Sequence, residues 1–144
     1  MVNKKTKLIV CSVPMTEPAV RNRVEPFFNK FIDEGYEVKL LCPSDVENRL
    51  LVRNDVEVIE VDVPVRKIDN FIKRALNEIR ASAIILSKAK TFHAANVLIV
   101  IPSMFLAFLA PFYMKKDNTY LDVCDLSWEY LNDRKLTHFV SKRI

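Results

Sequence analysis

The chain has 144 residues, of which 50% are hydrophobic and 28% are charged, a balance typical of one globular domain with its own core. It contains one glycine, Gly35. Neither the G-x-G-x-x-G fingerprint nor the Walker phosphate loop can be written with a single glycine. The composition therefore argues against dinucleotide binding of the Rossmann type and against P-loop nucleotide hydrolysis.

The net charge of +4 is unevenly distributed along the chain. Residues 1–63 hold 9 Lys and Arg against 11 Asp and Glu, whereas residues 64–116 hold 9 against 2, and residues 117–144 hold 4 against 5. The basic excess is confined to the middle third. This pattern predicts one cationic surface and not a generally basic protein.

The cysteines and histidines show no metal-binding spacing. Three cysteines are an odd number without a C-x-x-C motif, and the two histidines lie far apart in the sequence. We expect free thiols in a reducing cytoplasm and no metal site.

No signal peptide is visible, because the basic start precedes an apolar run of only strand length. We therefore expect a cytoplasmic protein.

Strands and helices are predicted to alternate through the first half of the chain. The expected elements are a buried strand over Lys7–Val13, a helix over Val20–Glu34 capped by Gly35, a strand over Glu37–Cys42, an uncertain helical turn within Asn48–Asp55, and a strand over Val56–Val63. The last of these alternates apolar and acidic residues, which predicts an edge strand with one solvated face.

The longest predicted helix covers Ile68–Lys90 and has two distinct faces. One stripe is apolar and is expected to face the core: Ile68, Ile72, Ala75, Leu76, Ile79, Ala83 and Leu86. Five basic residues cluster on roughly the opposite side: Lys67, Lys73, Arg74, Arg80 and Lys88. Such a face suits an anionic membrane surface, or it is simply a solvated helix face.

The remaining predicted elements are a strand over Val97–Ile101, a helix over Ser103–Lys115, a strand over Thr119–Val123 and a further helix from Asp133. Val97–Met114 has no charge and approaches the length of a membrane span. Pro102 and Pro111 interrupt it, so a strand and a short helix fit better. The alternation predicts a single α/β domain, doubly wound around a mostly parallel sheet.

Three stretches resemble the N-terminal domain of a GT-B glycosyltransferase, of the family 4 type that builds bacterial surface polysaccharides. They are KLIVCSV with its following loop and helix, DEGYEVKLLCP, and IPSMFLAFLAPFYMKKDNTYLDVCDLSWE. The loop SVPMTEPAV lacks the glycines that are usual in the family. The resemblance covers nearly the whole chain and implies that residues 1–144 form a Rossmann-like acceptor-side domain.

The resemblance also implies which partners and activity to expect. A nucleotide-sugar donor would be held by a C-terminal domain that is missing from these 144 residues, and the acceptor would be a saccharide or a lipid-linked saccharide. The chain alone would then be inactive, and no cofactor is implied. The alternative is a stand-alone α/β binding or regulatory module without transfer activity. Nucleic acid is not an expected partner, because aromatic residues are not interleaved with the basic ones.

The acidic block after the last predicted strand supplies the candidate catalytic residue. Asp125 would bind or deprotonate the acceptor hydroxyl, or else cap the following helix. Trp128 would stack on a sugar ring or pack in the core, and Glu129 closes the block. Asp122 is expected to be a buried, hydrogen-bonded structural carboxylate.

A second group of candidate residues follows the first predicted strand, at the same edge of the sheet. Glu17, Arg21 and Arg23 lie at the start of the first helix. Arginines and backbone amides at a helix N-terminus suit an anionic acceptor such as a lipid diphosphate. The alternative is a solvated first turn.

Overall fold

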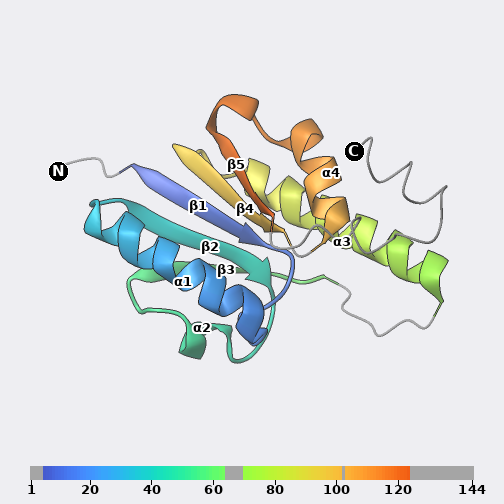
Figure 1. The fold of residues 1–144 in the computed structure, drawn as a ribbon, viewed down its shortest axis with the longest axis horizontal. Helices are drawn as coiled ribbons and strands as arrows, with labels where there is room; N and C mark the ends of the chain where they lie inside the picture. Colours follow the sequence, from blue (N-terminus) through green and yellow to red (C-terminus); the bar gives the residue numbers. More distant parts are fainter. Residues whose placement is uncertain (1–4, 64–69, 102, 124–144) are drawn as a thin grey trace.

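A computed structural model describes residues 5–63, 70–101 and 103–123 of the chain (Figure 1). The strands are β1 (Thr6–Cys11), β2 (Glu37–Pro43), β3 (Val56–Val61), β4 (Asn96–Ile101) and β5 (Thr119–Val123). The helices are α1 (Pro18–Asp33), α2 (Asn48–Leu51), α3 (Phe71–Lys90) and α4 (Met104–Tyr113), with a short 3-10 turn, η1 (Lys116–Asn118).

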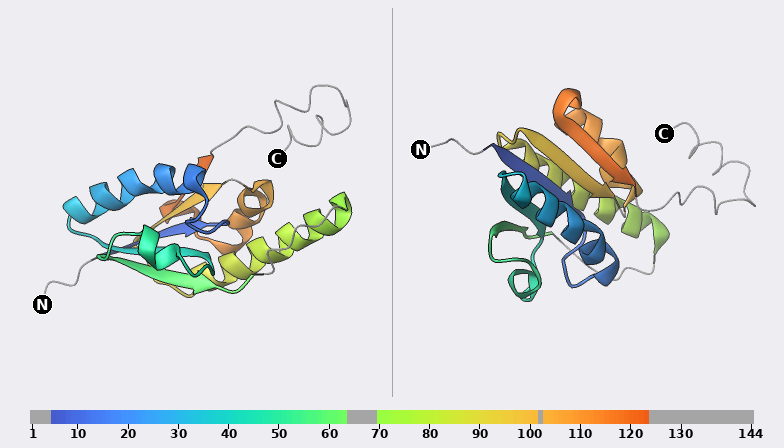
Figure 2. Two further views of the ribbon diagram at one scale, coloured as in Figure 1. Left: turned by 90° about the horizontal axis from the view of Figure 1, so that it is seen from below. Right: turned by 60° about the vertical axis from the view of Figure 1, so that its left-hand side comes forward.

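The five strands form one sheet in the order β3-β2-β1-β4-β5, and every neighbouring pair is parallel. β1 lies at the centre, as its continuous apolar sequence requires, because helices cover both faces of a parallel sheet. The α/β class and the Rossmann-like architecture predicted from the sequence are confirmed. The connections after β1 and after β4 lead to opposite faces of the sheet (Figure 2).

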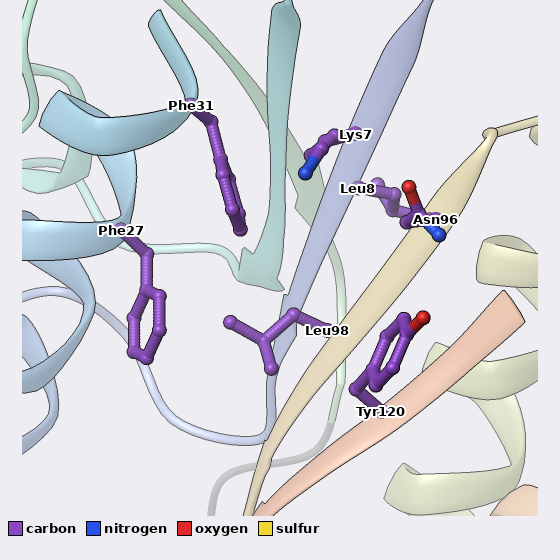
Figure 3. A pocket seen from close by; sticks show the side chains of 7 residues that line it. All are labelled: Lys7, Leu8, Phe27, Phe31, Asn96, Leu98 and Tyr120. Carbon is purple, nitrogen blue, oxygen red and sulfur yellow. The ribbon is translucent and has the colours of Figure 1, made fainter. Parts of the chain in front are cut away.

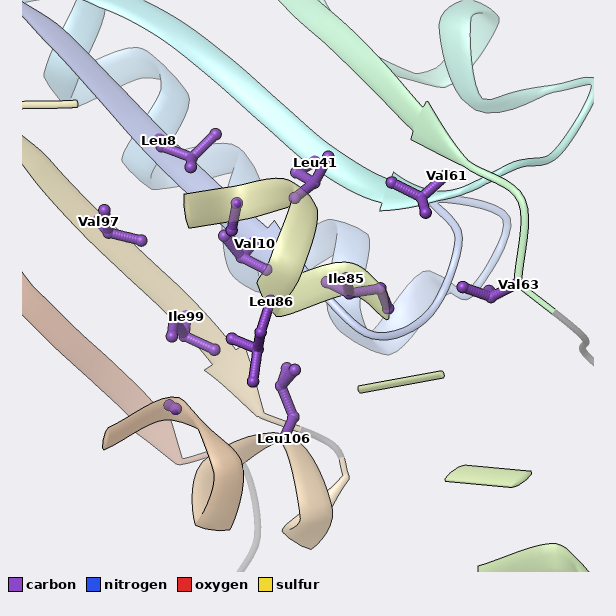
Figure 4. Close-up of a cluster of buried hydrophobic side chains, with 12 residues drawn as sticks. Leu8, Val10, Leu41, Val61, Val63, Ile85, Leu86, Val97, Ile99 and Leu106 are labelled. Carbon is purple, nitrogen blue, oxygen red and sulfur yellow. The ribbon is translucent and has the colours of Figure 1, made fainter. Parts of the chain in front are cut away.

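Two apolar cores hold the helices against the sheet. On one face, α1 and the segment around α2 pack over side chains such as Ile9, Leu40 and Val100. On the other face, α3 and α4 pack over Leu8 and Ile99 (Figure 4). Because successive strand residues point to opposite faces, β1, β2, β3 and β4 each supply side chains to both cores. The molecule is therefore a three-layer sandwich of helix, sheet and helix.

The single glycine ends α1. Gly35 adopts a φ of +83°, its N–H donates to Ile32 O at 2.8 Å, and the N–H of Tyr36 donates to Phe31 O at 3.0 Å. This pair of bonds is the Schellman arrangement, in which a left-handed residue follows the last helical turn. The predicted glycine cap is confirmed. The one glycine of the chain thus occupies a left-handed conformation, which residues with a side chain rarely adopt.

The predicted core stripe of the longest helix is only partly right. Ile72, Leu76 and Ile79 are 68%, 61% and 37% exposed, whereas the residues of α3 that face the sheet are buried. Those buried residues are Ser82, Ile85, Leu86 and Ala89. A 20-residue helix is about 30 Å long and a six-residue strand is about 20 Å long. The first turns of α3 therefore extend beyond the sheet (Figure 1).

The prediction for β3 is right about its place and wrong about its faces. β3 is an edge strand, paired with β2 in the described sheet. However, Val56 and Val58 belong to the α1-side core, while Ile59 and Val61 belong to the α3-side core. Both faces therefore pack against a core, although each also carries one glutamate.

The uncharged stretch in the second half of the chain is the predicted strand and helix, β4 and α4. Of the helices within residues 5–63, 70–101 and 103–123, none is both long and apolar enough to cross a membrane.

Candidate functional site

The carboxyl ends of β1 and β4 lie at the topological switch point of this sheet, an edge that we call the crevice. The two strands are neighbours, with Cys11 opposite Val100, but the chain leaves β1 toward α1 and leaves β4 toward α4. In open α/β sheets, ligands bind outside the carboxyl ends at the point where the connections diverge in this way. We therefore take this edge as the candidate site.

Two serines lie at this crevice with unusual surroundings. Ser12 follows β1 and Ser103 follows Pro102 after β4, and both hydroxyl oxygens are shielded from solvent. Neither hydroxyl has a hydrogen-bond partner among the described residues. An unmade bond of this kind costs about 1–3 kcal/mol, so orphan polar atoms call for an explanation. A polar ligand would supply the missing partners only after these side chains turn toward the crevice, because both oxygens are shielded as they stand.

Both helices that start at this edge lack a side-chain cap. Ser103 occupies the N-cap position of α4, but its side chain makes no capping hydrogen bond. Glu17 occupies the N-cap position of α1, again without a side-chain cap. Helix N-termini carry partial positive charge and unpaired N–H groups, which suit anions such as phosphate.

The loop between β1 and α1 is fixed by a buried asparagine and not by glycine. Asn48 is fully buried, and its Oδ1 accepts the N–H of Met15 at 2.8 Å. Its Nδ2 donates to Pro43 O at 2.8 Å and to Glu60 Oε1 at 2.9 Å. Thr16 Oγ1 also donates to Asp45 Oδ2 at 3.2 Å. These bonds tie the crevice loop to β2, β3 and α2.

A bidentate ion pair joins α1 to β5 at the same edge. Arg23 Nε donates to Asp122 Oδ2 at 2.5 Å, and an Nη atom donates to Asp122 Oδ1 at 2.7 Å. The same Nη atom lies 3.4 Å from the carbonyl oxygen of Val123. Asp122 is 19% exposed and Arg23 is 41% exposed. Asp122 is thus hydrogen-bonded, as the sequence predicted, but it is only partly buried.

The other predicted site residues fall into two groups. Glu17 is exposed, and Arg21 is half-buried beside it in the first turn of α1. Asp125, Trp128 and Glu129 lie outside the described residues. The site assignments from the sequence therefore stay predictions. Sequence reasoning missed Ser12 and Asn48, because a single serine or asparagine carries no local pattern.

The Cys42 thiol, near the carboxyl end of β2, is held protonated by its surroundings. Burial, and then the nearby carboxylates of Glu60 and Asp45, raise the pKa of the Cys42 thiol to about 12. A thiol held protonated in this way is neither a nucleophile nor a metal ligand. Within the described ranges, no three His, Cys, Asp or Glu side chains converge to hold a metal ion.

A separate pocket lies against the α1 side of the sheet, at the amino ends of the strands. It has a volume of about 240 Å³ and is lined by Phe27, Phe31, Leu98, Tyr120 and the base of Lys7, among others (Figure 3). The Lys7 amine is 4.1 Å from the ring centres of both Phe31 and Tyr36. This pocket is mainly apolar and lies at the opposite edge from the crevice.

The predicted membrane-facing residues of α3 are exposed where they are described. Lys73, Arg74, Arg80 and Lys88 all reach solvent, and Arg74 pairs with Glu78 at 3.1 Å. Lys67 lies outside the described residues.

Comparison of the chain with protein-family models, with curated proteins and with solved structures found no match. The glycosyltransferase resemblance therefore remains a prediction from the sequence.

Proposed function

We infer that this chain is the acceptor-binding half of a glycosyltransferase. It would hold a saccharide or a lipid-linked saccharide at the crevice between β1 and β4. The nucleotide-sugar donor would be bound by a second domain or chain, and transfer would require both halves.

The observation that carries this proposal is the Arg23–Asp122 ion pair. Arg23 belongs to the first βα unit and Asp122 to the acidic block, which are two of the stretches that resemble the glycosyltransferase family. The residues are 99 positions apart, yet their side chains form a bidentate bond at one edge of the sheet. The two stretches thus meet where an open α/β sheet binds its ligand.

The chemistry of the crevice fits an acceptor with hydroxyl groups and a diphosphate. The hydroxyls of Ser12 and Ser103 can each donate or accept one more hydrogen bond. The uncapped N-termini of α1 and α4 and the guanidinium of Arg21 favour negative charge. In this proposal Asp125 would take the proton of the acceptor hydroxyl, with Trp128 and Glu129 beside the sugar.

A binding experiment on the full chain tests the proposal. The probe is N-acetylglucosamine linked through a diphosphate to a short, water-soluble prenyl chain, and the comparison ligand is UDP-N-acetylglucosamine. We expect the chain to bind the lipid-linked sugar and not the nucleotide sugar. Removing both crevice hydroxyls, with Ser12→Ala and Ser103→Ala, should weaken binding by about fivefold for each hydroxyl.

Ser44→Ala is the matched control, because Ser44 is an exposed serine at the same edge, after β2 and away from the crevice. Its binding should equal that of the wild type. Preference for the nucleotide sugar, or binding to neither ligand, would favour a different function, such as the stand-alone α/β module.

A further inference from the structure

Helix α4 is apolar around its whole circumference, yet one side of it faces solvent. Its sequence, MFLAFLAPFY, contains no charged residue. Leu106 and Ala110 are buried against the sheet, whereas Phe108 is 46% and Phe112 is 74% exposed. The two rings lie side by side, with centres 6.0 Å apart. A helix that is apolar all round is normally buried on all sides, so this outer side indicates a contact surface.

The surroundings of this aromatic pair are strongly basic. Helix α3, which packs beside α4, carries five Lys and Arg residues and one Glu, a net charge of +4. Lys115 and Lys116, both exposed, follow Met114 at the end of α4, and the exposed Asp117 comes next. On the opposite layer, α1 carries three basic and two acidic residues, a net charge of +1. The positive charge therefore concentrates on the layer that also exposes the phenylalanines.

The same layer exposes further apolar side chains. Ile72 and Leu76 project from the first turns of α3, 68% and 61% exposed. They fall on the same stripe as Leu86, which belongs to the same buried apolar cluster as Leu106 of α4 (Figure 4). Lys73 and Arg80 lie on the neighbouring outward side of α3. The α3–α4 layer therefore exposes both apolar and basic side chains.

We propose that the α3–α4 layer docks on an anionic lipid bilayer, with Phe108 and Phe112 inserted among the lipid chains. The basic residues of α3 and the lysines after α4 would contact the lipid headgroups. Apolar rings surrounded by Lys and Arg match the interface of a charged membrane, where each basic residue near the surface contributes to binding. This docking does not depend on transfer chemistry, and it leaves the carboxyl edge of the sheet free.

Vesicle sedimentation with the full chain tests the docking. We expect binding to phosphatidylcholine vesicles that contain phosphatidylglycerol, weakening at high salt, and little binding to pure phosphatidylcholine. The double change Phe108→Ser and Phe112→Ser should weaken binding by about tenfold or more, because each ring loses its burial in lipid. Lys73→Ala and Arg80→Ala should each weaken it by about fivefold.

A matched control comes from the opposite layer. Val46 and Leu50 are 94% and 83% exposed, and Val46→Ser with Leu50→Ser should leave vesicle binding unchanged. Insertion can be followed directly with Phe112→Trp in a Trp128→Phe background. Its fluorescence should be quenched by brominated lipid, whereas that of Leu50→Trp in the same background should not.

Three results would overturn the proposal. The first is the absence of binding to anionic vesicles, and the second is binding that survives the loss of both rings. The third is a stable dimer that Phe108→Ser and Phe112→Ser dissociate while vesicle binding is unchanged, which would assign this face to a second copy of the chain. Because the vesicles carry no sugar-linked lipid, none of these outcomes bears on acceptor binding.

Discussion

At the scale of single residues, Asn48 shows how a chain with one glycine builds an ordered crevice loop. A glycine-rich loop lets the backbone approach a ligand closely. Here the buried side-chain amide of Asn48 holds the loop in place through the backbone N–H of Met15. Its three bonds satisfy backbone groups of Met15 and Pro43 and a carboxylate oxygen of Glu60. Neither its burial nor its partners follow from the sequence, because they are 5 to 33 positions away.

We expect Asn48→Ala to lower the free energy of unfolding by about 2 kcal/mol or more. The change leaves a buried N–H and a buried carbonyl without partners, and each such group costs about 1–3 kcal/mol. Urea denaturation measures the difference. Ser44→Ala, an exposed change nearby, should stay within about 0.5 kcal/mol of the wild type. A loss of the same size for both variants would contradict the assigned role of Asn48.

Cys42 gives a prediction about pH. The pKa of its thiol is raised from 9.0 to about 12 in the folded protein, so the folded state retains a proton that the unfolded state loses. The stabilisation is complete below pH 9 and is lost progressively from pH 9 to pH 12. Between pH 8 and pH 10 this group alone lowers the free energy of unfolding by about 1.4 kcal/mol.

The variant Cys42→Ala isolates this contribution, since both proteins share every other alkaline titration. Urea denaturation at pH 8 and pH 10 should show a smaller loss of stability for the variant than for the wild type. Equal losses would mean that the thiol titrates normally in the folded state.

At the scale of secondary structure elements, periodicity predicts where helices and strands form better than which side of a helix is buried. The predicted segments match β1, α1, β2, β4, α4 and β5 closely. The apolar stripe of α3 fails because burial depends on the length of the sheet beneath it. Ser82 is buried where α3 crosses the sheet, and Ile72 is exposed where α3 extends past it.

Leu76 and Leu86 make this difference measurable within one stripe. Leu86 is fully buried and Leu76 is 61% exposed, although sequence periodicity treats them alike. Leu86→Ala should cost about 2–5 kcal/mol of stability, as a cavity forms in the core. Leu76→Ala should cost less than about 1 kcal/mol. Similar losses in thermal or urea denaturation would mean that the stripe is buried along its whole length.

At the scale of the whole molecule, the alternation of strands and helices predicts the α/β class, and the structure confirms it. The strand order and the Arg23–Asp122 contact could not be predicted, because pairing between distant segments leaves no periodic signal. The sequence places the candidate site at the carboxyl edge of the sheet, and this placement stays a prediction. Ser12, Ser103 and Asn48 come together at this edge only through the fold, because no local sequence pattern marks them. Asp125 lies outside the described residues.

The contact between α1 and β5 predicts an energetic coupling across 99 residues. In a double-mutant cycle with Arg23→Ala and Asp122→Ala, we expect a coupling energy of about 0.5–1.5 kcal/mol, modest because both side chains reach solvent. The cycle is measured by urea denaturation. A coupling near zero would mean that the pair does not hold α1 against β5 in solution.

The most direct test of the central claim is to map the ligand on the protein by NMR. In a 15N-labelled sample titrated with the diphosphate-linked N-acetylglucosamine, the amides of Ser12, Arg21 and Ser103 should shift, and those at the amino ends of the strands should not. Shifts confined to the apolar pocket around Phe31 and Tyr120, or the absence of any shift, would contradict acceptor binding at the β1–β4 crevice.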